Sequence, residues 1–201
     1  MRKQRVRKWL TRLEDFMRNA IPFLTLSIAA SICFSCQANK GDTPSQTTTF
    51  TIREIMQSMV EPRATSLWNA VSTSVTDKGI ETKAPSNDEE WANVRHEAVT
   101  LSESMNVILT PGRMVAKPGE QAKDPTIELS PEQIEKLIRE DRESWAKLAH
   151  GLQDSVTKAI RAIDAKNADD LSSAGADIDQ ACETCHKKYW YPNDEKAQEK
   201  K

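Results

Sequence analysis

Two cysteines and a histidine near the C-terminus carry the clearest chemistry in this sequence. Residues 181–192 read ACETCHKKYWYP, so two residues separate Cys182 from Cys185 and His186 follows directly. Thiols and an imidazole at this spacing can attach a haem, bind a metal ion or form a disulfide. The rest of the chain has to discriminate between these three kinds of site.

The spacing favours covalent attachment of haem, because C-x-x-C-H is the signal for a c-type haem. Two thiols on one helical turn can each add to a vinyl group, and the adjacent imidazole can bind the iron from the same face. A thioredoxin-like disulfide needs a βαβ context that this sequence lacks, and a structural disulfide leaves His186 unexplained. A zinc site needs four ligands and would have to recruit His96 or His150.

The first 38 residues are predicted to be a signal peptide. Residues 1–36 carry seven Lys or Arg and two acidic residues, and an apolar run, AIPFLTLSIAASICF, follows the basic start. The run is short for a membrane span, although an uncleaved signal would act as one. Two processing routes stay open: cleavage after Ala38, or lipidation of Cys36 as a membrane tether. Both place the protein in the periplasm or elsewhere outside the cytoplasm, where thiols are joined to haem.

The remaining residues are acidic. Residues 37–201 hold 21 basic and 28 acidic residues, a net charge of −7. Nucleic acid is therefore a poor candidate partner, because binding phosphates needs clustered Lys and Arg. The sequence has no G-x-G-x-x-G, P-loop or H-E-x-x-H motif, and no acid–base pair or nucleophile stands out. We do not expect an enzyme.

Four helices are predicted from apolar residues at helical spacing. Pro62 should kink or split the first helix. Ser86 with Glu89 forms a capping-box pattern at the second, and Ser130 with Gln133 starts the third. The predicted helices span about 50–76, 86–111, 130–163 and 168–189.

These helices predict an all-α fold, an antiparallel four-helix bundle with a covalently attached c-type haem near its C-terminal end. A polar leader at 39–49 precedes the cytochrome domain at 50–192, and a charged tail follows at 193–201. The long connection at 111–129 contains Pro and Gly, and we expect it to be a crossover connection or an exposed loop. No run alternates with period two for long enough to predict a strand.

The motif at the end of the last helix resembles the class II c-type cytochromes, the cytochrome c′-like four-helix-bundle family. CETCHKKYW matches the family's C-x-x-C-H, and Tyr189 takes the place of a common Tyr three residues after the His. Trp190 stands where the family usually has Arg. The resemblance spans roughly 50–192. It implies one covalent haem c with thioethers at Cys182 and Cys185, His186 as the proximal iron ligand, and a homodimer as one candidate assembly.

The sixth iron position separates two functions within that family. Members with a Met from the first helix are electron carriers, whereas members with an apolar residue there bind nitric oxide or carbon monoxide. The first helix here offers Met56 and Met59, and a thioether ligand raises the redox potential. We favour Met56, with Met59 as its rival, although methionines on an apolar stripe often only fill the core. His96 and His150 are weaker rivals.

Other side chains are candidates for contact with a haem. Three tryptophans should be core aromatics, one of them against the porphyrin edge: Trp68, Trp91 and Trp145. Three arginines could pair with the haem propionates: Arg53, Arg63 and Arg113.

The predicted function is an exported mono-haem cytochrome c that carries single electrons, with its iron bound by His186 and Met56. The alternative is a five-coordinate haem protein that binds nitric oxide or carbon monoxide. A haem-free, copper-binding bundle would require the C-x-x-C-H to be a coincidence. A redox partner should carry a basic docking patch, because the mature chain is acidic.

Overall fold

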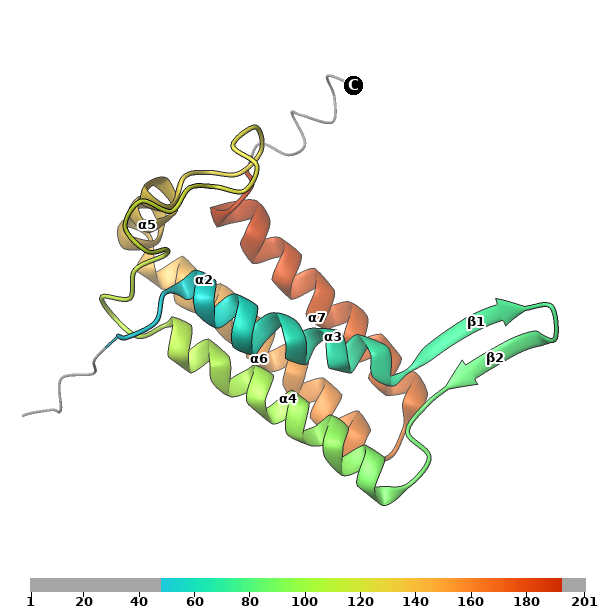
Figure 1. Cartoon of the computed structure of the whole chain (residues 1–201). Coiled ribbons are helices and arrows are strands. Elements are labelled where there is room, and N and C mark those ends of the chain that lie inside the picture. Colours follow the sequence, from blue (N-terminus) through green and yellow to red (C-terminus); the bar gives the residue numbers. More distant parts are fainter. Residues whose placement is uncertain (1–47, 193–201) are drawn as a thin grey trace, which may run out of the picture. The chain divides into compact units, whose positions relative to one another are not determined.

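The computed structural model describes residues 48–192, and this part of the chain is mostly helical (Figure 1). The predicted signal peptide, its processing sites Cys36 and Ala38, most of the leader and the tail at 193–201 lie outside the described residues and stay predictions. Among the described helices, none has both the length and the apolarity that crossing a bilayer requires.

The first helical run has three parts: α2 (Ile52–Ile55), the π-helical segment η2 (Met56–Val60) and α3 (Glu61–Ala70). A capping box begins it. The Thr51 hydroxyl accepts the N–H of Glu54, and the Glu54 carboxylate accepts the N–H of Thr51 in return. The predicted first helix is therefore present, but it ends at Ala70.

Pro62 gives the physical reason for the π-helical segment. Proline has no N–H to donate to the carbonyl of Ser58, and its ring crowds that carbonyl. The turn before it is wider, and the N–H of Glu61 donates to the carbonyl of Met56, five residues back. The expected kink or split at Pro62 thus takes the form of a π-helical segment, which contains both candidate methionines.

A β-hairpin follows where the sequence predicted the end of a helix and a loop. Strands β1 (Ser72–Thr76) and β2 (Gly79–Lys83) pair antiparallel around Asp77 and Lys78. Gly79 has a φ of 116°, which favours glycine. The expectation of no strands was wrong because both faces of this hairpin are exposed, so its sequence has no apolar alternation. The hairpin projects away from the helices (Figure 1).

Helix α4 (Asp88–Ile108) begins slightly later than predicted. Its N-cap is Asn87, whose side chain accepts the N–H of Glu90 at 3.0 Å. The Glu90 carboxylate in turn accepts the N–H of Ser86 at 2.6 Å. The predicted pair of Ser86 and Glu89 is therefore one residue early, and Asn caps a helix as well as Ser does.

The predicted third helix is two helices, α5 (Pro131–Glu140) and α6 (Arg142–Asp164). Asp141 lies between them with φ −134° and ψ 63°, outside the helical region. Its carboxylate accepts the N–H of Ser144 at 3.0 Å and so caps α6, and it also pairs with Lys188 Nζ at 2.8 Å. The apolar spacing continues across Asp141, so the pattern predicted one helix and missed the break.

The start of α5 confirms the predicted capping box and offers a test of it. The Ser130 hydroxyl accepts the N–H of Gln133 at 3.3 Å, and the Gln133 side chain accepts the N–H of Ser130 at 2.8 Å. We expect Ser130→Ala to lower the free energy of unfolding by about 1 kcal/mol, because a helix N–H loses its acceptor. Urea unfolding followed by circular dichroism measures this. Ser130→Thr keeps the hydroxyl, so an equal loss in both variants would contradict the role of the cap.

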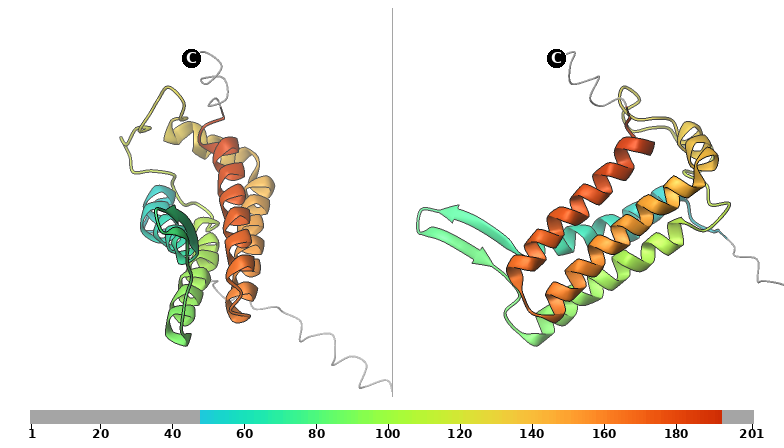
Figure 2. Two further views of the ribbon diagram at one scale, coloured as in Figure 1. Left: turned by 90° about the vertical axis from the view of Figure 1, so that its right-hand side faces the viewer. Right: turned by 180° about the vertical axis from the view of Figure 1, so that it is seen from behind.

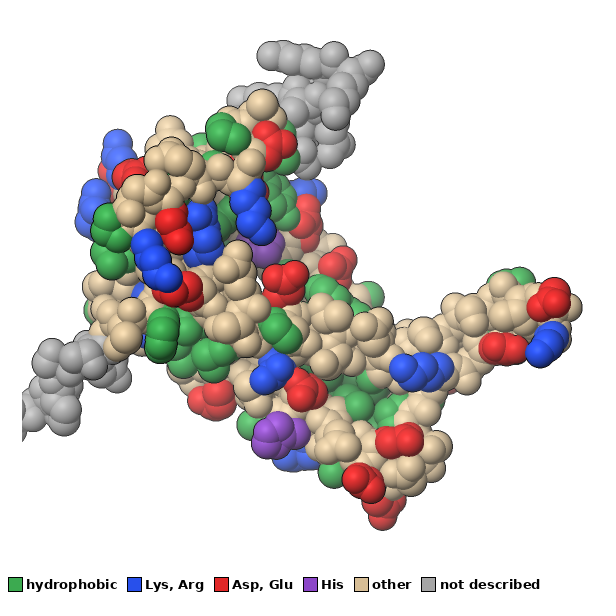
Figure 3. Space-filling view, in the orientation of Figure 1, with side chains coloured by type: hydrophobic (Ala, Val, Ile, Leu, Met, Phe, Trp, Pro, Cys, Tyr) green, Lys and Arg blue, Asp and Glu red, His purple; other side chains and the backbone are tan. Residues whose placement is uncertain are grey.

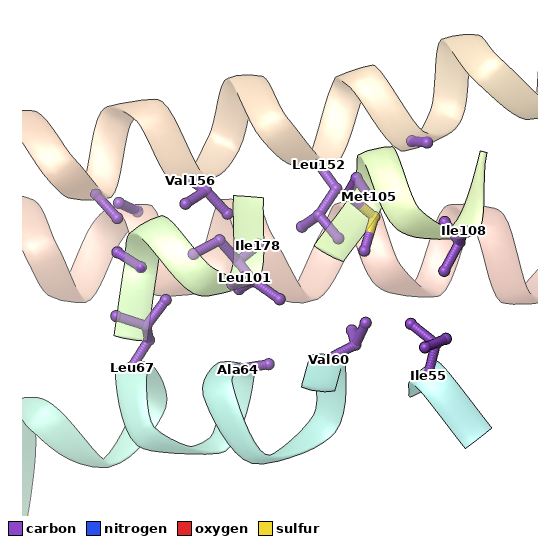
Figure 4. Packing of buried hydrophobic residues seen from close by; sticks show 14 of the residues in the cluster. Ile55, Val60, Ala64, Leu67, Leu101, Met105, Ile108, Leu152, Val156 and Ile178 are labelled. Carbon is purple, nitrogen blue, oxygen red and sulfur yellow. The ribbon is translucent and has the colours of Figure 1, made fainter. Parts of the chain in front are cut away.

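The fourth predicted helix is confirmed as α7 (Ala168–Tyr189). Helix α6 packs on α7 and on α4, and α3 packs on α4; Figure 2 shows α6 beside α7 and α4 beside the first helical run. Leu101, Val156 and Ile178 are fully buried where these elements meet (Figure 4). The same core continues toward the C-terminal end of α7, where the motif lies.

Candidate functional site

The three side chains of the C-x-x-C-H motif lie on one face of α7, near its C-terminal end. Cys182, Cys185 and His186 stand at positions i, i+3 and i+4, a spacing that puts side chains on the same side of a helix. Each is half-buried, whereas Thr184 within the motif is exposed. Helix formation alone therefore brings the two thiols and the imidazole together.

These three side chains line one mainly apolar cavity between the helices. It is narrow, with a volume of about 40 Å³. Ligand sites typically combine such apolar walls with a few polar groups. The lining residues are Met56 and Val60 from η2, Met105 and Ile108 from α4, Trp145, Leu148, Ala149 and Leu152 from α6, and Ala181, Cys182, Cys185 and His186 from α7.

Only one of the two candidate methionines lines the cavity. Met56 is among its lining residues and Met59 is not, although both are half-buried against the core. Met56 is also the first residue of η2, and π-helical segments occur frequently at functional sites. Met105, only 2 % exposed, lines the same cavity and was missed by the sequence analysis. Its place on the apolar stripe of α4 gave no local signal that distinguished it from ordinary core.

Burial controls the protonation of the motif. It raises the pKa of Cys182 to about 11 and that of Cys185 to about 12, and the negative charge of Asp179 adds to the effect at Cys182. Both thiols are therefore uncharged at neutral pH. Burial also lowers the pKa of His186. Its imidazole is thus neutral at pH 7, which is the form that binds a metal ion.

A second, more polar recess adjoins the cavity. It shares Met56 and His186 with the cavity and has a volume of about 260 Å³. An apolar interior next to a charged opening suits a ligand that is largely apolar with polar groups at one edge. The other residues that line the recess are Arg53, Gln57, Glu61, Lys123, Glu128, Trp190 and Tyr191.

The connection at 111–129 borders this recess. The N–H of Ile52 donates to the carbonyl of Met114 at 2.9 Å, and the N–H of Leu129 donates to the carbonyl of Trp190 at 2.8 Å. Both ends of the connection are thus attached to the helices that carry the site. The connection is therefore not an exposed loop that projects from the helices, because it forms part of the recess wall.

Ion pairs hold this connection against the first helical run. Arg53 pairs with Glu120 at 3.3 Å, and Lys117 pairs with Glu54 at 2.6 Å. Lys117, together with the N–H and hydroxyl of Thr51, lowers the pKa of Glu54 to about 2. Figure 3 shows basic side chains gathered over this end of the molecule with acidic ones among them.

We expect Lys117→Gln to lower stability slightly at neutral pH, and this effect to fade as the pH falls through about 2. The pKa of Glu54 is about 2 in the folded chain and 4.5 without these contacts. The pair's contribution is therefore complete above about pH 4.5 and is lost as the pH falls toward 2. The loss is small because exposed ion pairs contribute little. Thermal unfolding between pH 7 and pH 2 measures this dependence.

The control for that experiment is Lys147→Gln. Lys147 is exposed on α6, so this variant removes the same charge without touching Glu54. The difference in stability between this variant and the wild type should not become smaller between pH 4.5 and pH 2. If both variants followed the same course, the effect would belong to net charge and not to the ion pair.

The rival histidines lie away from the site. His96 on α4 and His150 on α6 are both exposed, and neither lines the cavity or the recess. His150 Nδ1 lies 2.8 Å from the side-chain oxygen of Gln153. Across residues 48–192, no three His, Cys, Asp or Glu side chains gather closely enough to hold a metal ion.

Some of the predicted arginines and tryptophans lie at the predicted places in the structure, and others do not. Of the three arginines, Arg53 lines the recess, whereas Arg63 pairs with Glu97 at 3.0 Å and Arg113 donates to the carbonyl of Val107 at 2.9 Å. The core placement of Trp91 and Trp145 is confirmed, with exposures of 7 % and 2 %. The core placement of Trp68 was wrong: it is 39 % exposed, and its indole N–H donates to the carbonyl of Gly175.

Trp145, which lines the cavity, has a polar atom without a partner in the described part of the chain. Its indole Nε1 is buried and has no hydrogen-bond partner among the described residues. Buried N–H groups in folded proteins are nearly always paired. A ligand that carries an acceptor would fit this cavity, as would one that reacts with thiols and binds an imidazole.

No protein-family model matches this chain, and no curated protein matches it either. Solved structures that resemble it are cytochromes c prime. The nitric oxide complex of a mutant cytochrome c prime from Alcaligenes xylosoxidans is 18 % identical, with a TM-score of 0.45 over 70 % of this chain and 94 % of that one. Cytochrome c′ from Thermochromatium tepidum is 19 % identical, with a TM-score of 0.33 over 71 % and 98 % of the two chains. At these values the likeness does not decide the function.

Proposed function

We propose that the described helices form an antiparallel four-helix bundle that binds one covalent haem c. Cys182 and Cys185 would form its thioethers, and His186 would be the proximal iron ligand. The observation that carries this proposal is one apolar cavity whose walls include Cys182, Cys185 and His186. The unpaired N–H of Trp145 and the charged recess beside the cavity also fit a ligand that is apolar in its body and acidic at one edge.

The proposed activity is the transfer of single electrons, with Met56 as the sixth iron ligand. When bound, haem c supplies a one-electron ferric–ferrous couple, and a thioether ligand raises its potential. The chain's own part is to exclude water with apolar walls, to hold a neutral imidazole and to offer a sulfur atom from η2. Met56 is supported over Met59 because Met56 lines the cavity together with His186. This role is that of a carrier and not of an enzyme.

The proposed location and partner follow from the sequence. We place the protein outside the cytoplasm, in the periplasm, because of the signal-like N-terminus and because haem is joined to thiols there. Its redox partner should present a basic docking patch to a mature chain with a net charge of −7. Arg53 and Lys123 at the recess would lie near one of the two haem carboxylates.

An absorption spectrum tests the proposal. The chain is produced in a host with c-type cytochrome maturation and recorded in both oxidation states, with and without carbon monoxide. We expect a red protein that keeps its colour after acid–organic extraction and has a low-spin spectrum that carbon monoxide does not change. A high-spin spectrum that shifts with carbon monoxide would favour the five-coordinate alternative. A colourless protein would overturn the haem proposal.

A further inference from the structure

The indole N–H of Trp145 is a donor with no acceptor in the protein. Trp145 is 2 % exposed, so solvent cannot supply the acceptor, and Nε1 has no hydrogen bond within the described residues. The indole nitrogen can donate but not accept. Leaving such a group unpaired in the folded state is costly, which indicates that something else satisfies it.

The walls of the cavity do not offer the acceptor. Apart from the motif, the residues that line it with Trp145 are Ala, Val, Leu, Ile and Met. Nearby Tyr189 meets the indole edge to face, with ring centroids 5.2 Å apart and an interplanar angle of 89°. Its hydroxyl donates to the carbonyl of Asp141 at 3.3 Å. An acceptor oxygen is therefore most simply supplied by what occupies the cavity.

We propose that Trp145 positions the bound haem by donating its indole N–H to one of the haem carboxylates. This inference rests on the proposed function. The propionates are the acceptor groups at the edge of a haem, because the pyrrole nitrogens bind the iron. A hydrogen bond from a neutral donor to a carboxylate in such a dry environment is strong and directional.

The order of residues along α7 supports the same pairing. The two thioethers would form at Cys182 and Cys185, whereas Trp145 contacts Tyr189, further toward the C-terminal end of the helix. In a haem, the propionates lie on the edge opposite the two vinyl positions that become thioethers. A porphyrin joined at the two cysteines would therefore hold its carboxylates away from these thioethers, and Trp145 meets α7 at Tyr189, about one turn beyond Cys185.

The test uses the holo-protein and the variant Trp145→Phe, which keeps an aromatic ring but removes the indole N–H together with part of the ring volume. Losing the donor leaves the carboxylate charge less compensated, which stabilises ferric iron. We expect the ferric–ferrous equilibrium to shift about threefold toward ferric, and the propionate bands in the resonance Raman spectrum to move. The control is Trp91→Phe on α4, because Trp91 is equally a core residue but does not line the cavity.

The outcomes separate this inference from the haem proposal. A shift in both potential and propionate bands in Trp145→Phe but not in Trp91→Phe supports the hydrogen bond. If a red, folded Trp145→Phe protein matches the Trp91→Phe control in both measurements, the indole N–H contacts the Tyr189 ring or a buried water, and the inference is wrong. A colourless wild type would instead refute the haem site on which the inference depends.

Discussion

Replacing Cys182 and Cys185 together by alanine is expected to abolish covalent haem, from about one per chain to nearly none. The thioethers are the only bonds in the proposed site that survive acid and organic solvent. Each single variant should keep one thioether and part of its colour after extraction. Pyridine haemochrome spectra before and after acid–organic extraction, with haem counted per chain, measure the effect.

Thr184→Ala is the matched control, because Thr184 lies between the two cysteines and is exposed. It changes the motif without removing a thiol and should retain full covalent haem. The double cysteine variant could still hold haem through His186 in the apolar cavity, but that colour would leave with the solvent. Full covalent haem in the double variant would show that the C-x-x-C-H assignment is wrong.

Local signals in the sequence predicted the parts of the site that lie on one helix. The spacing of Cys182, Cys185 and His186 puts them on one face of α7, and the apolar pattern before them predicted that helix from Ala168 to Tyr189. The capping box at Ser130 was equally readable, because it depends on two residues three positions apart. Such features need no knowledge of the tertiary structure.

The fold was predicted wrongly where the spacing of apolar residues does not reveal the secondary structure. The hairpin at 72–83 exposes both faces, with Val75 and Ile80 opposite one another at 84 % and 75 % exposure. Its Thr, Val and Ile residues favour extended structure, but only through a weak, context-dependent propensity. The break at Asp141 is hidden for the opposite reason, because the buried stripe continues from α5 into α6.

The cavity itself was beyond a reading of one sequence, because it forms where four helical elements meet. Met105 is a core residue by pattern, and nothing in its neighbours along the chain marks it as a wall residue of a site. Trp145 was a candidate for haem contact, but only as one of three tryptophans. The preference for Met56 over Met59 came from the place of Met56 in the IREIM segment. The cavity adds a physical reason for it, since the π-helical segment begins at Met56 and only Met56 of the pair is among the lining residues.

Met56→Ala is expected to convert a low-spin, carbon monoxide-insensitive haem into a high-spin one that binds carbon monoxide. Removing a thioether ligand also destabilises ferrous iron, so the potential should fall on the order of 0.1 V, a fraction of the range of about 0.8 V that axial ligands set. Absorption spectra with and without carbon monoxide and a redox titration measure both effects. Haem content should stay near one per chain, because the thioethers are untouched.

Two further methionine variants decide which sulfur is responsible. Met59→Ala removes a methionine of the same helical run that does not line the cavity, and it should leave the spectrum low-spin. Met105→Leu removes the sulfur that α4 brings to the cavity while keeping the volume of a buried side chain. If the low-spin spectrum is lost in Met105→Leu and kept in Met56→Ala, the sixth ligand comes from α4 and the π-helical segment serves only the packing. If the wild type is low-spin and no single variant changes its spectrum, methionine ligation is wrong and another group is the sixth ligand. Only a high-spin wild type would leave the sixth position open for a gas.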